Sequence, residues 1–86
     1  MKIYYSSIFK EKVKLLDKKT KKTFKNKLKL MINNLYHPSL RTKKIQGTDN
    51  IFEASITMGY RMTWQYYKEG VLLRNIGEHD DTLKNP

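Results

Sequence analysis

The sequence contains no cysteine. A disulfide framework, a thiolate metal site and a cysteine nucleophile are therefore excluded. Its two histidines lie far apart, and no carboxylate accompanies them at the spacing of helical metal ligands, so we expect no metal and no cofactor.

Long hydrophobic runs are also missing: none approaches the roughly 20 residues that span a bilayer, and residues 1–5 do not resemble the apolar part of a signal peptide. We expect a soluble, cytoplasmic protein without a membrane-bound state.

Acidic residues are scarce. Eight Asp and Glu stand against 18 Lys and Arg, for a net charge of +10. The excess is confined to residues 1–50, which carry fourteen basic and three acidic residues, a net +11, whereas residues 51–86 have a net charge of −1. A field of this size attracts polyanions, and nucleic acid is the commonest polyanion in the cytosol. An acidic protein or an anionic membrane would satisfy the same electrostatics.

The basic half begins with a short strand and a helix. Lys2 to Tyr5 is β-prone and predicts a first strand that can join a later sheet. Ser6 and Ser7 then offer side-chain oxygens that can cap a helix. The apolar stripe of this helix consists of residues at helical spacing, namely Phe9, Val13 and Leu16.

A second helix follows a polar break from Asp17 to Lys22, and either Asp17 or Thr20 can cap it. Pro38 prevents the helix from continuing. Its apolar residues recur over three turns: Phe24, Leu28, Met31, Ile32 and Leu35. Residues 37–50 then form a loop-like, basic segment that leads into the rest of the chain.

Residues 51–81 predict three antiparallel strands. Apolar and polar residues alternate with a period of two from 52 to 57 and from 60 to 67, so one face is buried, with Tyr60 and Trp64, and the other is wet. Met58-Gly59 and Lys68-Glu69-Gly70 are hairpin turns. The third strand runs to His79.

This order of elements predicts an α+β fold over a single domain, residues 1–86. We expect a β-α-α-β-β-β chain in which two N-terminal helices pack on one face of a twisted, mainly antiparallel, four-stranded sheet. The helices then cover one face only, and the other face is free for a site.

That wet face is the candidate site. Glu53, Ser55 and Arg61 share it by the period of two. The simplest interpretation of Arg61 is a solvated residue paired with Glu53, but a guanidinium can also bind two phosphate oxygens and never loses its charge. His79 is either an exposed histidine near the end of the chain or an acid–base group, since histidine ordinarily titrates near neutrality. Tyr67 is the aromatic residue best placed for RNA contact.

Three motifs, by their order and spacing, resemble the RelE/ParE superfamily of bacterial toxins. Lys44-Ile45-Gln46-Gly47 is similar to the K-L-x-G segment before the family's sheet, and Tyr60 to Tyr66, YRMTWQY, is similar to its Y-R-L-V-Y strand. Leu72 to His79 is similar to the last strand, which ends in G-x-H in YafQ-like members. The resemblance implies a RelE-like fold and the toxin of a type II toxin–antitoxin system, an mRNA interferase of the RelE/YafQ type. It implies a ribosome-dependent, metal-independent endoribonuclease that inhibits translation, with the ribosome, mRNA and a cognate antitoxin as partners.

The resemblance also implies roles for single residues. Arg61 matches the arginine that holds the scissile phosphate, and His79 stands where members place the arginine or histidine that assists the leaving group. Glu53 and Ser55 occupy positions where RelE has lysines and YafQ has a histidine, so neither inherits a role by identity. Glu53, kept ionised by its neighbour Arg61, can accept a proton. We expect three catalytic residues, Arg61, His79 and Glu53. We expect five RNA- or phosphate-binding residues, Lys43, Lys44, Ser55, Tyr67 and Arg74.

Two alternatives stand beside the nuclease. Members of the ParE branch inhibit DNA gyrase and do not cut RNA. An inactive homologue would retain antitoxin binding alone, and this alternative has support because residues 81–86 contain no aromatic residue where many active members carry one. The +11 first half opposes self-association, so we expect an acidic antitoxin to be the stabilising partner in a toxin–antitoxin hetero-oligomer.

Overall fold

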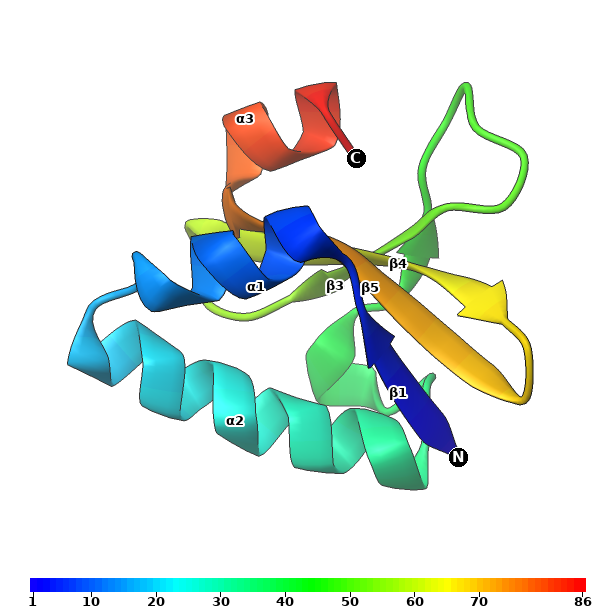
Figure 1. Ribbon diagram of the computed structural model, residues 1–86, viewed down its shortest axis with the longest axis horizontal. Helices are drawn as coiled ribbons and strands as arrows, with labels where there is room; N and C mark the ends of the chain where they lie inside the picture. Colours follow the sequence, from blue (N-terminus) through cyan, green and yellow to red (C-terminus); the bar gives the residue numbers. More distant parts are fainter.

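The computed structural model describes residues 1–86 and has an α+β architecture. In Figure 1 the sheet crosses the molecule with α2 below it and α3 above it. In chain order the elements are β1 (Lys2–Tyr5), α1 (Ser7–Lys14), α2 (Lys18–Asn33), the 3-10 helix η1 (Pro38–Leu40), β2 (Lys43–Lys44), β3 (Phe52–Ser55), β4 (Tyr60–Tyr67), β5 (Gly70–Glu78) and α3 (His79–Lys84). None of the helices has the length and hydropathy of a membrane span.

The sheet has five strands in the order β1-β5-β4-β3-β2, so the expectation of four strands was wrong. β1 runs parallel to β5 and the other neighbours are antiparallel, which makes the sheet mixed. A parallel neighbour needs a long crossover connection, and here the connection includes both long helices. The fifth strand is β2, two basic residues inside the segment expected to be a loop; Lys43 lies opposite Glu53.

Both long helices begin at side-chain caps. The Ser6 hydroxyl accepts a hydrogen bond from the Phe9 N–H at 3.0 Å. The Asp17 carboxylate accepts one from the Thr20 N–H at 2.7 Å. Of the two candidate caps, Asp17 is therefore the one used, and α2 begins at Lys18, inside the segment expected to be a polar break.

The core lies between these helices and one face of the sheet. Trp64 is fully buried at its centre and stacks on Phe52, with 4.6 Å between ring centroids. Tyr60 is half-buried and packs against the same cluster, so the prediction that both aromatic residues face the interior is confirmed. The buried apolar residues are Phe9, Leu16, Phe24, Met31, Leu40, Ala54, Ile56, Met62, Trp64, Val71, Leu73 and Ile76.

The opposite face of the sheet is partly covered too, which corrects the expectation that helices cover one face only. β5 is followed directly by α3, and the chain then returns across the sheet. Thr63 Oγ1 and Arg74 Nε both donate to the backbone oxygen of Pro86, at 2.8 and 3.0 Å. Asn75 Nδ2 donates to the backbone oxygen of Asn85 at 2.9 Å. A six-residue polar helix has no apolar periodicity, so the sequence pattern did not reveal α3.

The Asp17 cap makes stability depend on pH. Its hydrogen bonds from Thr20 hold the pKa of the Asp17 carboxyl below its ordinary value. A carboxyl whose pKa is lowered on folding stabilises the fold above its unfolded pKa, and this contribution is lost as the pH falls through the folded value. Asp17→Asn keeps an uncharged cap. We therefore expect the Tm of wild type to exceed that of Asp17→Asn at neutral pH and the difference to shrink in acid, as measured by circular dichroism. A difference that stays constant would show that the charge contributes nothing.

Candidate functional site

Polar side chains form rows across the sheet face that is turned away from the core. The β3–β4 register places Ser55 opposite Arg61 and Glu53 opposite Thr63. Lys43 of β2 continues the second row, opposite Glu53. Because directly paired residues project to the same face, four of the predicted site residues come together here.

Arg61 is held by the turn between β3 and β4. Its Nη1 donates to three backbone oxygens at 2.7 to 3.0 Å, those of Thr57, Met58 and Tyr60. Its Nε lies 3.7 Å from Glu53 Oε1, and each of these two side chains is only 14% exposed. The expected pairing with Glu53 is present, but the arginine is not solvated. Nη2 keeps two N–H donors without a partner in the chain.

His79 is tied to the same turn from a different element. As the first residue of α3, it donates its backbone N–H to the Gly59 oxygen at 2.9 Å. Its side chain is 45% exposed, and its Nδ1 lies 3.1 Å from Asp80 Oδ1. Asp80 can therefore orient the imidazole and leave Nε2 free for another group. No three His, Cys, Asp or Glu side chains come together in the structure as a metal site would need.

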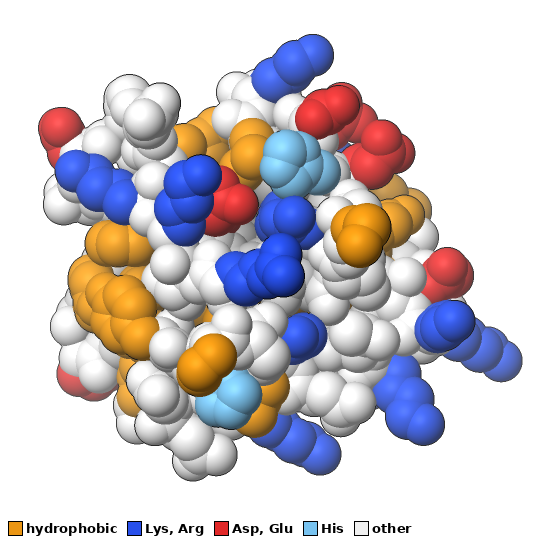
Figure 2. All heavy atoms as spheres, turned by 180° about the vertical axis from the view of Figure 1, so that it is seen from behind, with side chains coloured by type: hydrophobic (Ala, Val, Ile, Leu, Met, Phe, Trp, Pro, Cys, Tyr) orange, Lys and Arg blue, Asp and Glu red, His pale blue; other side chains and the backbone are white.

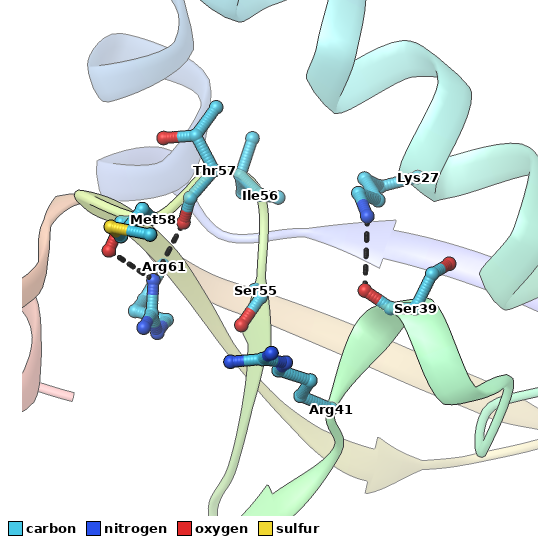
Figure 3. A pocket seen from close by; sticks show the side chains of 8 residues that line it. All are labelled: Lys27, Ser39, Arg41, Ser55, Ile56, Thr57, Met58 and Arg61. Atoms are coloured by element: carbon cyan, nitrogen blue, oxygen red, sulfur yellow. Dashed lines mark hydrogen bonds between the residues drawn. The ribbon is translucent and has the colours of Figure 1, made fainter.

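The surface beside Arg61 is hollowed. This depression, which we call the Arg41 hollow, has a volume of about 240 Å³ and lies between the outer edge of β3, η1 and α2 (Figure 3). Its lining consists of three cations, Lys27, Arg41 and Arg61, two serines, Ser39 and Ser55, and residues 56–58 of the turn. No carboxylate lines it. Figure 2 shows basic side chains gathered at the centre of this face, one acidic side chain beside them, and histidines above and below.

Sequence reasoning did not select Lys27, Ser39 or Arg41 as site residues. Arg41 belongs to a basic cluster that is visible in the sequence, but only the tertiary structure shows that it lines the same hollow as Ser55. Lys27 is one of many lysines on α2, and nothing in the periodicity distinguishes it. Its Nζ donates to the Ser39 backbone oxygen at 2.9 Å, a contact between two elements.

Two predicted RNA contacts lie away from this centre. Lys44 is paired with Phe52, so its side chain starts on the other face of the sheet from Lys43. Arg74 lies under the C-terminal segment, where it donates to Pro86 and to the Gln65 side chain. Through its bond to Pro86, Arg74 holds the segment after α3 against the sheet.

Tyr67 is at the far end of β4, six residues or about 20 Å from Arg61. It packs edge-to-face on Tyr4, with 5.0 Å between ring centroids, and Lys68 lies over both rings. The Tyr4 hydroxyl donates to Glu69, and this bond raises the pKa of Tyr4 to about 12 and lowers the pKa of Glu69. Tyr67 thus belongs to a separate cluster and is not brought to the Arg61 site.

The sequence matches no model of a protein family and no curated protein. The structure, in contrast, is similar to solved toxins. The YoeB/ParE toxin from Agrobacterium tumefaciens superposes with a TM-score of 0.79 at 10% identity, over 92% of this chain and 99% of that one. A chain of the E. coli DinJ-YafQ complex gives a TM-score of 0.76 at 21% identity, over 93% of this chain and 94% of that one. A chain of the RelB-RelE antitoxin-toxin complex from Methanococcus jannaschii gives 0.73 at 15% identity, over 96% and 98%. These likenesses extend over nearly the whole of each chain, and the protein therefore has the fold of the RelE/ParE toxins.

Proposed function

We propose that this protein is the toxin of a type II toxin–antitoxin system and that it acts in the cytoplasm by cutting mRNA on the ribosome. The observation that carries the proposal is the joint anchoring of Arg61 and His79 to one turn of a basic face. Arg61 keeps an unpartnered Nη2 and His79 an unpartnered Nε2. The fold shared with RelE and YafQ supports this proposal.

The proposed reaction uses the RNA's own 2′-hydroxyl. Its oxygen attacks the adjacent phosphorus while its proton passes to water, the bond from phosphorus to the 5′-oxygen breaks, and that oxygen takes up a proton. The products are a 2′,3′-cyclic phosphate and a 5′-hydroxyl end. Arg61 binds the non-bridging oxygens, where negative charge grows in the transition state. His79 transfers a proton at the leaving oxygen.

Glu53 takes a positioning role in this scheme. Its carboxylate is paired with Arg61 Nε and is as little exposed as the guanidinium. A carboxylate in this place fixes the plane of the guanidinium and leaves Nη2 for the phosphate. The role of general base predicted for Glu53 would require the RNA to displace part of this ion pair.

An acidic antitoxin is the proposed partner. The DinJ-YafQ and RelB-RelE structures are complexes of a toxin with an antitoxin. In this chain the lysines of α1 and α2 form the basic surface to which an acidic segment would bind, because residues 1–50 carry all of the excess positive charge.

The proposal is tested by adding the purified protein to ribosomes programmed with a defined mRNA and mapping the ends by primer extension. We expect cuts within the codon at the ribosomal A site, only when ribosomes are present, with 5′-hydroxyl ends. Intact mRNA at protein concentrations equal to those of the ribosomes would overturn the proposal.

A second candidate is an inactive homologue that binds an antitoxin and does not cut. Two observations favour it: Arg61 commits Nη1 and Nε to the turn and to Glu53, and α3 carries no aromatic residue. Intact mRNA together with tight antitoxin binding would identify this case. Intact mRNA together with inhibition of gyrase supercoiling would identify the ParE-like alternative.

A further inference from the structure

The Arg41 hollow exists because β2 is very short. Lys43 pairs with Glu53, and continuing this antiparallel register by two residues brings Arg41 opposite Ser55. Arg41 has a φ of 49°, in the left-handed region, so the chain turns away and the strand pairing stops before it. The outer edge of β3 is therefore left open at Ser55, and η1 and α2 form the far wall (Figure 3).

The hollow offers more hydrogen-bond donors than the chain uses. The Arg41 guanidinium makes no hydrogen bond or ion pair within the protein, and neither does the Ser55 hydroxyl. Lys27 Nζ donates one of its three N–H groups to the Ser39 backbone oxygen, and the other two have no partner in the chain. With the free Nη2 of Arg61, donors from β3, β4, α2 and the segment before β2 converge on one space.

The charge of the hollow is also uncompensated. Glu53 neutralises Arg61 from outside the lining, so Arg41 and Lys27 are left without a counter-charge. A guanidinium, an ammonium and a hydroxyl around a depression of about 240 Å³ form a set that suits a tetrahedral oxyanion. Because Arg41, Ser55 and Arg61 line the same hollow, an anion held by Arg41 would be next to one held by Arg61.

We propose that the Arg41 hollow binds a backbone phosphate of single-stranded RNA, adjacent to the phosphate that Arg61 contacts. Arg41 and Lys27 contact this phosphate and Ser55 donates to it. The inference rests on the proposed function in so far as RNA is the ligand of this face. It adds a subsite that fixes the register of the RNA on the sheet and takes no part in the chemical step.

The test is the binding of a fluorescent single-stranded RNA to the full chain without ribosomes; methyl groups on the 2′-oxygens of this RNA prevent cleavage. Anisotropy is measured at several salt concentrations for wild type, Arg41→Gln, Lys27→Gln and Lys29→Gln. Lys29 is the matched control, because it lies about 200° around α2 from Lys27 and its replacement removes the same charge. Circular dichroism verifies that each variant is folded.

We expect Arg41→Gln to lower the affinity roughly tenfold and to reduce the slope of log affinity against log salt by about 0.7, the value for one phosphate contact on a single strand. Lys27→Gln should behave similarly and Lys29→Gln should change both quantities little. Equal losses in all three variants would show general attraction to a basic surface and would overturn the inference, as would a wild type that binds no RNA.

Failure of this inference can be distinguished from failure of the proposed function. If wild type leaves ribosomal mRNA intact while Arg41→Gln still weakens RNA binding, the nuclease proposal fails and the subsite stands. If wild type cuts mRNA and Arg41→Gln binds RNA as wild type does, the subsite fails and the nuclease stands. If the subsite is correct and the enzyme cuts, Arg41→Gln should raise KM more than it lowers kcat.

Discussion

Replacing Arg61 by alanine is expected to lower the rate of ribosome-dependent mRNA cleavage roughly 100- to 1000-fold, the usual effect of removing one donor that stabilises transition-state charge. The measurement is a single-turnover cleavage assay on programmed ribosomes, with ribosome binding followed separately. Binding should change little, because the charge on the phosphate grows as the reaction proceeds.

Arg61→Ala also has a structural effect. The side chain is 14% exposed and carries three hydrogen bonds to the turn, and its loss leaves Glu53 unpaired. We expect the free energy of unfolding to fall by about 1–3 kcal/mol. The sequence suggested a solvated arginine, whose loss would change this free energy little.

Arg61→Lys is therefore the informative companion variant. Lysine keeps the positive charge near Glu53, but its single ammonium cannot bond the turn and Glu53 and also offer the two N–H groups that Nη2 keeps for a phosphate. Arg61→Lys should unfold close to wild type and still cut slowly. If a folded Arg61→Lys cuts as fast as wild type, the guanidinium has no special role in phosphate binding.

His79→Ala is expected to lower the cleavage rate roughly 100- to 10000-fold, the range for loss of a proton-transfer group. Its side chain is 45% exposed, and the backbone bond to Gly59 remains, so the fold should be unaffected. The residual rate should lose the part of its pH dependence that the imidazole contributes. The measurement is the same single-turnover assay over a series of pH values.

The control for His79 is Asp80→Asn, which removes the carboxylate 3.1 Å from Nδ1 and leaves the imidazole in place. We expect a smaller loss of rate, because the imidazole is still present to transfer a proton. If His79→Ala keeps the wild-type rate and pH profile, the proton transfer must be assigned elsewhere, and Glu53 becomes the first residue to test.

Local signals in the sequence were sufficient for most of the secondary structure. Ser6 and Asp17 are caps that act within three residues, and Gly59 lies in the turn between β3 and β4. The alternation along β3 and β4 correctly separated the buried Trp64 from the polar row with Arg61, because strand geometry assigns faces by counting. The α+β class and the order of β1, α1, α2, β3, β4 and β5 follow from the same patterns.

The sequence by itself thus determined the class of the fold, the charge of its first half and the face on which Arg61 lies. Only the tertiary structure decided that β1 is parallel, that β2 exists, that the C-terminal segment covers Arg74, and that Arg41 and Lys27 meet beside Ser55. These features are contacts between segments far apart in the chain, and no local period encodes a pairing register or the point at which it stops. Two strand residues and a left-handed Arg41 carry no periodic signal, yet they create the hollow in which the cations gather.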